Sequence, residues 1–210
     1  MKNSKYLTLA RAINHLERLA KQTSKLNWSD GKLWYRRAHL YALSLSEYAP
    51  NQSLELSCGV IAALSPQCTW PENIRVATLM IKGEPLGATL AYPANIEKAK
   101  RILRGEKPLD VLGGLKVLAF YDNILNYKTS LLVTVDTHAS RAALNKITLD
   151  KNEVGWIFSA NGNALIQAAY VEVAKRYKVQ PCVLQASLWL RVKDIINTNA
   201  GLNQLGLYVK

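Results

Sequence analysis

One acidic side chain follows a run of apolar residues where a helix is expected to begin. Residues 133–138 (VTVDTH) place the carboxylate of Asp136 after a β-branched stretch. Either Asp136 or Thr137 can cap the helix expected over residues 139–144. A carboxylate delivered by a buried segment can also stabilise a developing cation or accept a proton from water. These roles do not exclude each other, so Asp136 is a candidate catalytic residue.

A pair of glycines separates two further helical patterns. Gly113 and Gly114 lie between them, and Lys116 follows two residues later. Glycines allow a tight turn with positive φ, and the N-terminus of the next helix offers backbone N–H groups to a phosphate. The pattern predicts a hairpin over about residues 109–125; a simple turn between helices is the alternative.

The third segment of interest ends a helix at a proline. Residues 63–69 (ALSPQCT) contain Gln67 directly after this break. Trp70 and Asn73 follow. They could line a pocket for a nucleobase (a base pocket), since aromatic faces stack on bases. Core packing is the alternative for Trp70.

The balance of charge favours a polyanionic partner. The chain has 27 Lys and Arg against 15 Asp and Glu, a formal net charge of +12, and neutralising phosphates releases counterions. A stretch just before the glycine pair, with Lys98, Arg101 and Arg104, suits a DNA backbone. A solvated helix face is the alternative for this stretch.

Cysteine usage and hydropathy narrow the class of protein further. The three cysteines are far apart and include no Cys-x-x-Cys pair, so we expect neither a metal site nor a cofactor. A reducing, cytoplasmic setting fits them, associated with the nucleoid if the source is bacterial. No apolar run approaches the ~20 residues of a membrane span, and no signal-type core follows the basic start. We therefore expect no membrane partner.

The elements that must position these residues are mostly helical. Residues 131–135 look like a short strand, but one isolated strand cannot form a sheet, so the expected fold class is mainly α. Helical spacing of apolar residues predicts helices over about residues 6–22, 31–47, 54–64, 73–80, 94–103, 117–125, 139–144, 162–177 and 182–196. We expect one domain over residues 1–210, with the acidic segment at about residues 131–144.

Taken together, the three motifs resemble the endonuclease III group of helix-hairpin-helix DNA glycosylases. In that group a glycine-containing hairpin is followed by Val-Asp-Thr-His, as here, and residues 63–69 resemble its Leu-Ser-Ala-Gln-x-Thr segment. The resemblance covers about residues 54–145. The sequence departs from the family pattern at the hairpin, where the stretch from the first glycine to Lys116 is one residue shorter than usual. The four-cysteine iron–sulfur motif of endonuclease III is absent.

The resemblance implies a fold of two helical lobes with a central cleft, acting as a monomer on duplex DNA. Gln67 would enter the base stack beside a flipped-out base. Asp136 would be the catalytic carboxylate, and Lys116 would contact phosphate or form a Schiff base in a lyase reaction.

Further residues near these motifs are expected to take part. His138 and Arg141 are candidate DNA contacts or helix-end partners, and Asn123 is a candidate for the base pocket. Gln185, Tyr170 and Trp189 are interpreted as core residues.

The predicted function is hydrolysis of the N-glycosidic bond of a damaged or modified base in DNA. The alternatives are processing of a modified base without excision, as in viral and bacterial DNA-modification systems, and a non-catalytic DNA-binding module. An intact Asp136 argues against the last, because a pure binder gains nothing from a carboxylate near phosphates.

Overall fold

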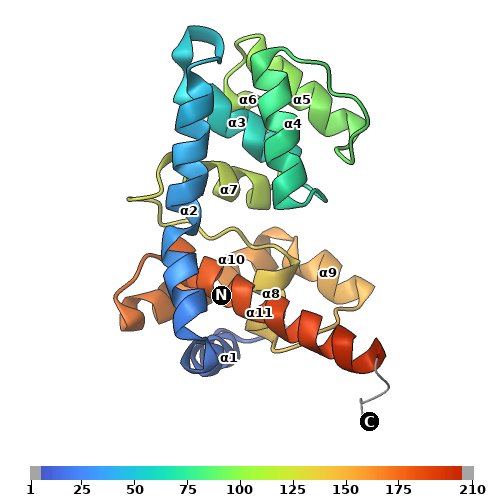
Figure 1. The fold of residues 1–210 in the computed structure, drawn as a ribbon. Helices are drawn as coiled ribbons and strands as arrows, with labels where there is room; N and C mark the ends of the chain where they lie inside the picture. Colours follow the sequence, from blue (N-terminus) through green and yellow to red (C-terminus); the bar gives the residue numbers. More distant parts are fainter. Residues whose placement is uncertain (1–5, 205–210) are drawn as a thin grey trace. The chain divides into compact units, whose positions relative to one another are not determined.

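The structure is mainly α, which confirms the predicted fold class. The computed structural model describes the backbone of residues 6–204 and the side chains of residues 6–198. Every regular element in this part of the chain is a helix (Figure 1). None of the helices found there has the length and apolar character needed to cross a membrane.

The chain divides into two compact units. The terminal unit combines Met1–Trp34 with Leu131–Lys210, and the middle unit is Tyr35–Ser130. The terminal unit contains α1 (Leu9–Gln22), the first part of α2 (Lys25–Ser46), α8 (Thr137–Leu144), α9 (Lys151–Ile157), α10 (Ala160–Tyr177) and α11 (Pro181–Gln204). The middle unit contains the rest of α2, the 3-10 turn Pro50–Gln52, α3 (Leu54–Leu64), α4 (Trp70–Lys82), α5 (Pro93–Leu103), α6 (Pro108–Val111) and α7 (Leu115–Leu125).

The terminal unit has its core where α1, α8, α10 and α11 meet. In α1 the buried residues Ala12, Leu16 and Ala20 recur every four positions, so one stripe of the helix faces α10 and α8. Gly31 of α2 lies directly against α11, because a Cβ atom there would stand 2.6 Å from the backbone of Ser187. Only glycine permits this approach of the two helices.

The middle unit is built around α3. Residues 56–64 of this helix are all buried, and it packs against α4, α5 and α7. A helix that is apolar on all sides is stable only when neighbouring elements bury it on all sides. Its predicted bounds are correct because Ser53 caps its first turn and Ser65 ends it before a proline.

Several elements differ from the sequence-based predictions. Helix α2 begins at Lys25, earlier than predicted, and the short helices α6 and α9 were not predicted. Residues 131–135 form no regular element and pair with no strand within the described residues. The backbone N–H of Val133 instead donates to Gln167 Oε1 over 3.1 Å, so a side chain takes the place of a neighbouring strand.

Candidate functional site

Asp136 caps the N-terminus of α8. The chain reaches it through Val133 and Val135, whose side chains are fully buried. The backbone N–H of Ala139 donates to Asp136 Oδ1 over 2.7 Å, and the N–H of Ser140 donates to the Asp136 carbonyl over 2.9 Å. Asp136 is therefore the N-cap, and a well-packed backbone holds its side chain.

A second contact fixes the other carboxylate oxygen. Trp189 of α11 donates its indole Nε1–H to Asp136 Oδ2 over 2.8 Å. An ionised carboxylate has about four lone-pair sites, so these two bonds leave acceptor capacity. Within the described residues no Lys, Arg or His nitrogen forms an ion pair with Asp136. Its negative charge is thus oriented but not neutralised by a salt bridge.

Cationic and aromatic side chains surround this contact. The His138 ring meets the Trp189 indole edge-on, with centroids 5.6 Å apart and an interplanar angle of 86°. Lys193 Nζ lies 4.6 Å from the centroid of the same indole, a cation–π contact. Arg141 Nη1 donates to His138 Nδ1 over 3.2 Å. We call Asp136, His138, Arg141, Trp189 and Lys193 the Trp189 cluster.

Trp34 of α2 packs against the cluster. Its ring centroid lies 5.3 Å from that of Trp189, with an angle of 45° between the planes. Both rings belong to the terminal unit, so the indole that holds Asp136 is itself braced by an aromatic neighbour.

The cluster favours a neutral histidine. Burial lowers the pKa of His138; the Asp136 carboxylate opposes this, and the positive charges of Arg141 and Lys193 lower the pKa further. Because Arg141 donates to Nδ1, the ring proton belongs on Nε2. The buried Nε of Arg141 has no hydrogen-bond partner among the described residues.

This arrangement combines an oriented carboxylate with two nearby cations. The carboxylate can stabilise a developing positive charge or accept a proton from water. Arg141 and Lys193 make the surroundings favourable to an anionic ligand such as a phosphodiester. In the part of the chain that the structure describes, no group of His, Cys, Asp and Glu side chains could hold a metal ion.

In the middle unit, Gln67 lies in the turn between α3 and α4. Its side chain is exposed, and its φ of 56° is in the left-handed region. That conformation is uncommon for a long side chain and marks a constrained turn. The hydroxyl of Tyr92 donates to Gln67 Oε1 over 2.5 Å.

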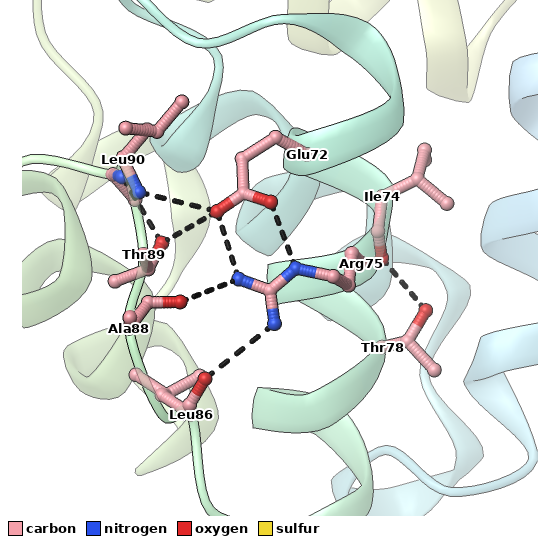
Figure 2. A network of polar contacts seen from close by, with 9 residues as sticks. Glu72, Ile74, Arg75, Thr78, Leu86, Ala88, Thr89 and Leu90 are labelled. Carbon is pink, nitrogen blue, oxygen red and sulfur yellow. Dashed lines mark hydrogen bonds and ion pairs between the residues drawn. The ribbon is translucent and has the colours of Figure 1, made fainter.

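A polar network fixes the loop that leads to Tyr92. Figure 2 shows Glu72 and Arg75 of α4 paired side by side and bonded to this loop. Glu72 Oε1 accepts from the Thr89 hydroxyl over 2.9 Å and from the Leu90 N–H over 3.2 Å, and Arg75 Nη2 donates to the Ala88 carbonyl over 2.9 Å. The hydrogen bond from Arg75, with those from Leu90 and Thr89, lowers the pKa of Glu72 to about 2.

The candidate base-pocket residues occupy different environments. Trp70 begins α4, is partly buried, and meets Phe120 edge-on at 6.4 Å. Asn73 is buried; its Nδ2 donates to the Ile61 carbonyl over 2.9 Å, whereas its Oδ1 has no partner among the described residues. Asn123 is fully buried and its Oδ1 accepts from Ser130 over 2.7 Å. The two asparagines thus hold the interior of the middle unit together, and their role in a base pocket stays a prediction.

The segment predicted as a hairpin contains α6, residues 112–114 and α7. Gly113 and Gly114 are exposed, and Gly114 caps α7 with a φ of 83° that a side chain would disfavour. No side chain caps this helix end. Lys116, on the first turn of α7, is partly buried.

The basic stretch is partly neutralised by its own neighbours. Arg101 pairs with Glu106 at 2.6 Å, and Arg104 pairs with Glu97 at 2.9 Å. Lys98 is in no ion pair within the described residues. The available positive charge on this face is therefore smaller than the three residues suggest.

Trp189 and Lys193 are the site residues that sequence reasoning missed. The interpretation of Trp189 as a core aromatic explains its ring but not its indole N–H, which needs an acceptor. The available signal was the spacing of four between Trp189 and Lys193, which puts both on one face of α11. Nothing in the local sequence identifies Asp136 as the acceptor.

Comparison with known proteins gives one family. Residues 1–195 match the model of a family described as "family of unknown function (DUF7178)". No curated protein and no solved structure matches the chain.

Proposed function

The chain belongs to the DUF7178 family, and we propose that it is a DNA glycosylase that releases a damaged or modified base from DNA. The observation that carries the proposal is the Asp136 carboxylate, held by Ala139 N–H and Trp189 Nε1–H without an ion-pair partner in the described residues. The order of the hairpin and the Val-Asp-Thr-His segment, which resembles that of helix-hairpin-helix glycosylases, supports the same reaction.

The chemistry follows from the charge of Asp136. Breaking the bond between C1′ of the sugar and the base leaves the electron pair on the base and positive charge on the sugar. The fixed carboxylate stabilises that cation, and its remaining lone pairs can take a proton from the water that attacks C1′. In this proposal Arg141 and Lys193 contact neighbouring phosphates, and the net charge of +12 supports a polyanionic partner.

The middle unit supplies further DNA contacts in this proposal. Gln67 fills the space that a flipped base leaves, and its constrained turn reduces the entropy lost on insertion. Gly113 and Gly114 offer backbone N–H groups to a phosphate at the start of α7. Lys116 contacts phosphate there or, in a lyase reaction, attacks C1′.

The finer assignments belong to the same proposal. In it, the helical architecture is that of a helix-hairpin-helix glycosylase, and the protein works as a monomer on duplex DNA in the cytoplasm, associated with the nucleoid if the source is bacterial. The proposed reaction uses no metal or cofactor.

The experiment that tests the function uses a panel of duplexes that each carry one modified base. After incubation with the protein, abasic sites are scored by alkaline cleavage and released bases by mass spectrometry. Base release from at least one duplex supports the glycosylase. A base that is altered in mass but retained in the strand would show an enzyme that processes the base without excising it. DNA binding without any product would show a non-catalytic DNA-binding module.

A further inference from the structure

We propose that Trp189 is a positioning residue that holds the Asp136 carboxylate in one orientation for base release. This inference rests on the proposed function and deepens it. The Asp136 carboxylate turns about a broad, roughly two-fold torsion, so with the cap bond at Oδ1 alone the whole planar group can still swing and change the direction in which Oδ2 points. The bond of 2.8 Å from the Trp189 indole fixes that direction.

The surroundings of Trp189 make it a rigid donor. Trp34 packs at 5.3 Å, His138 meets the ring edge-on at 5.6 Å, and Lys193 Nζ stands 4.6 Å from its centroid. An indole held on several sides loses little entropy when it donates its hydrogen bond. The ammonium of Lys193 also draws electron density from the ring, which makes the Nε1–H a better donor to a carboxylate.

The orientation of the carboxylate matters most in the transition state. A carboxylate that must reorient as the sugar becomes cationic stabilises it less than one already in place. Trp189 does not need to touch the DNA for this effect, because it acts through Asp136. Its loss should therefore slow the chemical step and leave DNA affinity unchanged.

Trp189→Phe tests this, because phenylalanine keeps an aromatic ring but has no N–H. Single-turnover base release is measured on the duplex that the wild type processes, alongside DNA affinity. We expect at least about a 10-fold slower rate with unchanged affinity, since hydrogen bonds to charged groups are among the strong ones. An unchanged rate, or a loss confined to affinity, would overturn the proposal.

Trp28→Phe is the matched control. Trp28 is also a partly buried tryptophan of the terminal unit, but its Nε1 donates to the Ala20 carbonyl at 3.4 Å and its ring stacks on Tyr177. It should leave the rate of base release unchanged. A thermal melt of both variants shows whether a slower rate comes from unfolding; an equal slowing in both variants would count against a specific role of Trp189.

A spectroscopic readout separates this inference from the function. In a ¹H–¹⁵N spectrum, the Trp189 Nε1–H signal is identified by its loss in Trp189→Phe. We expect it to move when Asp136 is changed to Asn, while the Trp28 signal stays. A Trp189 signal that does not respond overturns the contact. If the wild type releases no base from any duplex, the proposed function fails, and this signal alone decides whether Trp189 holds the carboxylate.

Discussion

The indole N–H of Trp189 reaches Oδ2 of Asp136 over 2.8 Å although 53 positions separate the two residues in the chain. The contact ties α11 to the first turn of α8. It gives the cap residue of α8 a second hydrogen bond that capping alone does not need.

Asp136→Asn separates catalysis from capping. Asparagine caps a helix about as well as aspartate, so the fold and DNA binding should persist. The loss of charge should slow base release by about 10²-fold or more. Asp150→Asn is the control, because Asp150 caps α9 through the backbone N–H groups of Asn152 and Glu153. If the Asp136→Asn variant is as active as the wild type, Asp136 is only a cap.

Gln67→Ala should slow base extrusion without weakening non-specific binding. Extrusion is followed by the fluorescence rise of 2-aminopurine placed beside the modified base. Gln52→Ala is the control, since Gln52 is also exposed, with a φ of 51° in the same unit. Equal extrusion rates in wild type and Gln67→Ala would remove Gln67 from the DNA contact.

Neutralising Lys98, Arg101 and Arg104 to glutamine should weaken DNA binding and flatten its salt dependence. Each lost phosphate contact changes the slope of log affinity against log salt by about 0.9. Because Arg101 and Arg104 already pair with glutamates, we expect a change below the roughly 2.7 that three free cations would give.

A second triple variant controls for net charge. It changes Lys175, Arg176 and Lys178 of the terminal unit. As in the first triple variant, two of these cations, Lys175 and Arg176, are already in ion pairs. Replacement of all three by glutamine removes the same charge from another surface. If both triple variants lose the same affinity and slope, the effect is one of overall charge, and α5 is not at the interface.

Acid should release the loop that leads to Tyr92. The pKa of Glu72 is lowered from 4.5 to about 2 in the folded protein. Its stabilising contacts are therefore complete above about pH 4.5 and are lost as the pH falls towards 2. Hydrogen exchange of the Leu90 amide, corrected for intrinsic rates, should lose protection over this window.

Glu72→Ala should give the same loss at neutral pH. Glu106→Ala is its control, because Glu106 pairs with Arg101 and has no bond to this loop. A Leu90 amide that stays protected in Glu72→Ala would show that other contacts fix the loop.

Local signals predicted much of the helical architecture. The bounds of α3 follow from Ser53 and from the Ser65-Pro66 break, and the apolar run before Asp136 predicted a cap at Asp136 or Thr137, of which the structure has Asp136. The short helix α9 was missed, although Asp150 and Glu153 form a capping box that marks its start.

What sequence could not predict depends on long-range pairing. The partner of Asp136 lies on another helix, and no local periodicity encodes which indole reaches it. Asn123 is buried and bonded to Ser130, seven positions along the chain, and no local pattern shows that these two side chains meet. For Arg101 the partner is only five residues away, yet glutamates at that distance are often unpaired, so only the structure shows the neutralisation.

The division of the terminal unit between two distant stretches of the chain has a consequence for biosynthesis. Residues 6–34 leave the ribosome well before their packing partners in residues 131–198. The middle unit, which is continuous, can fold in the meantime, as domains generally do during synthesis. Trp189 is among the last of the described residues to be made, so Asp136 gains its second hydrogen bond late in translation. A chain interrupted before α11 would carry Asp136 but not the donor that orients it.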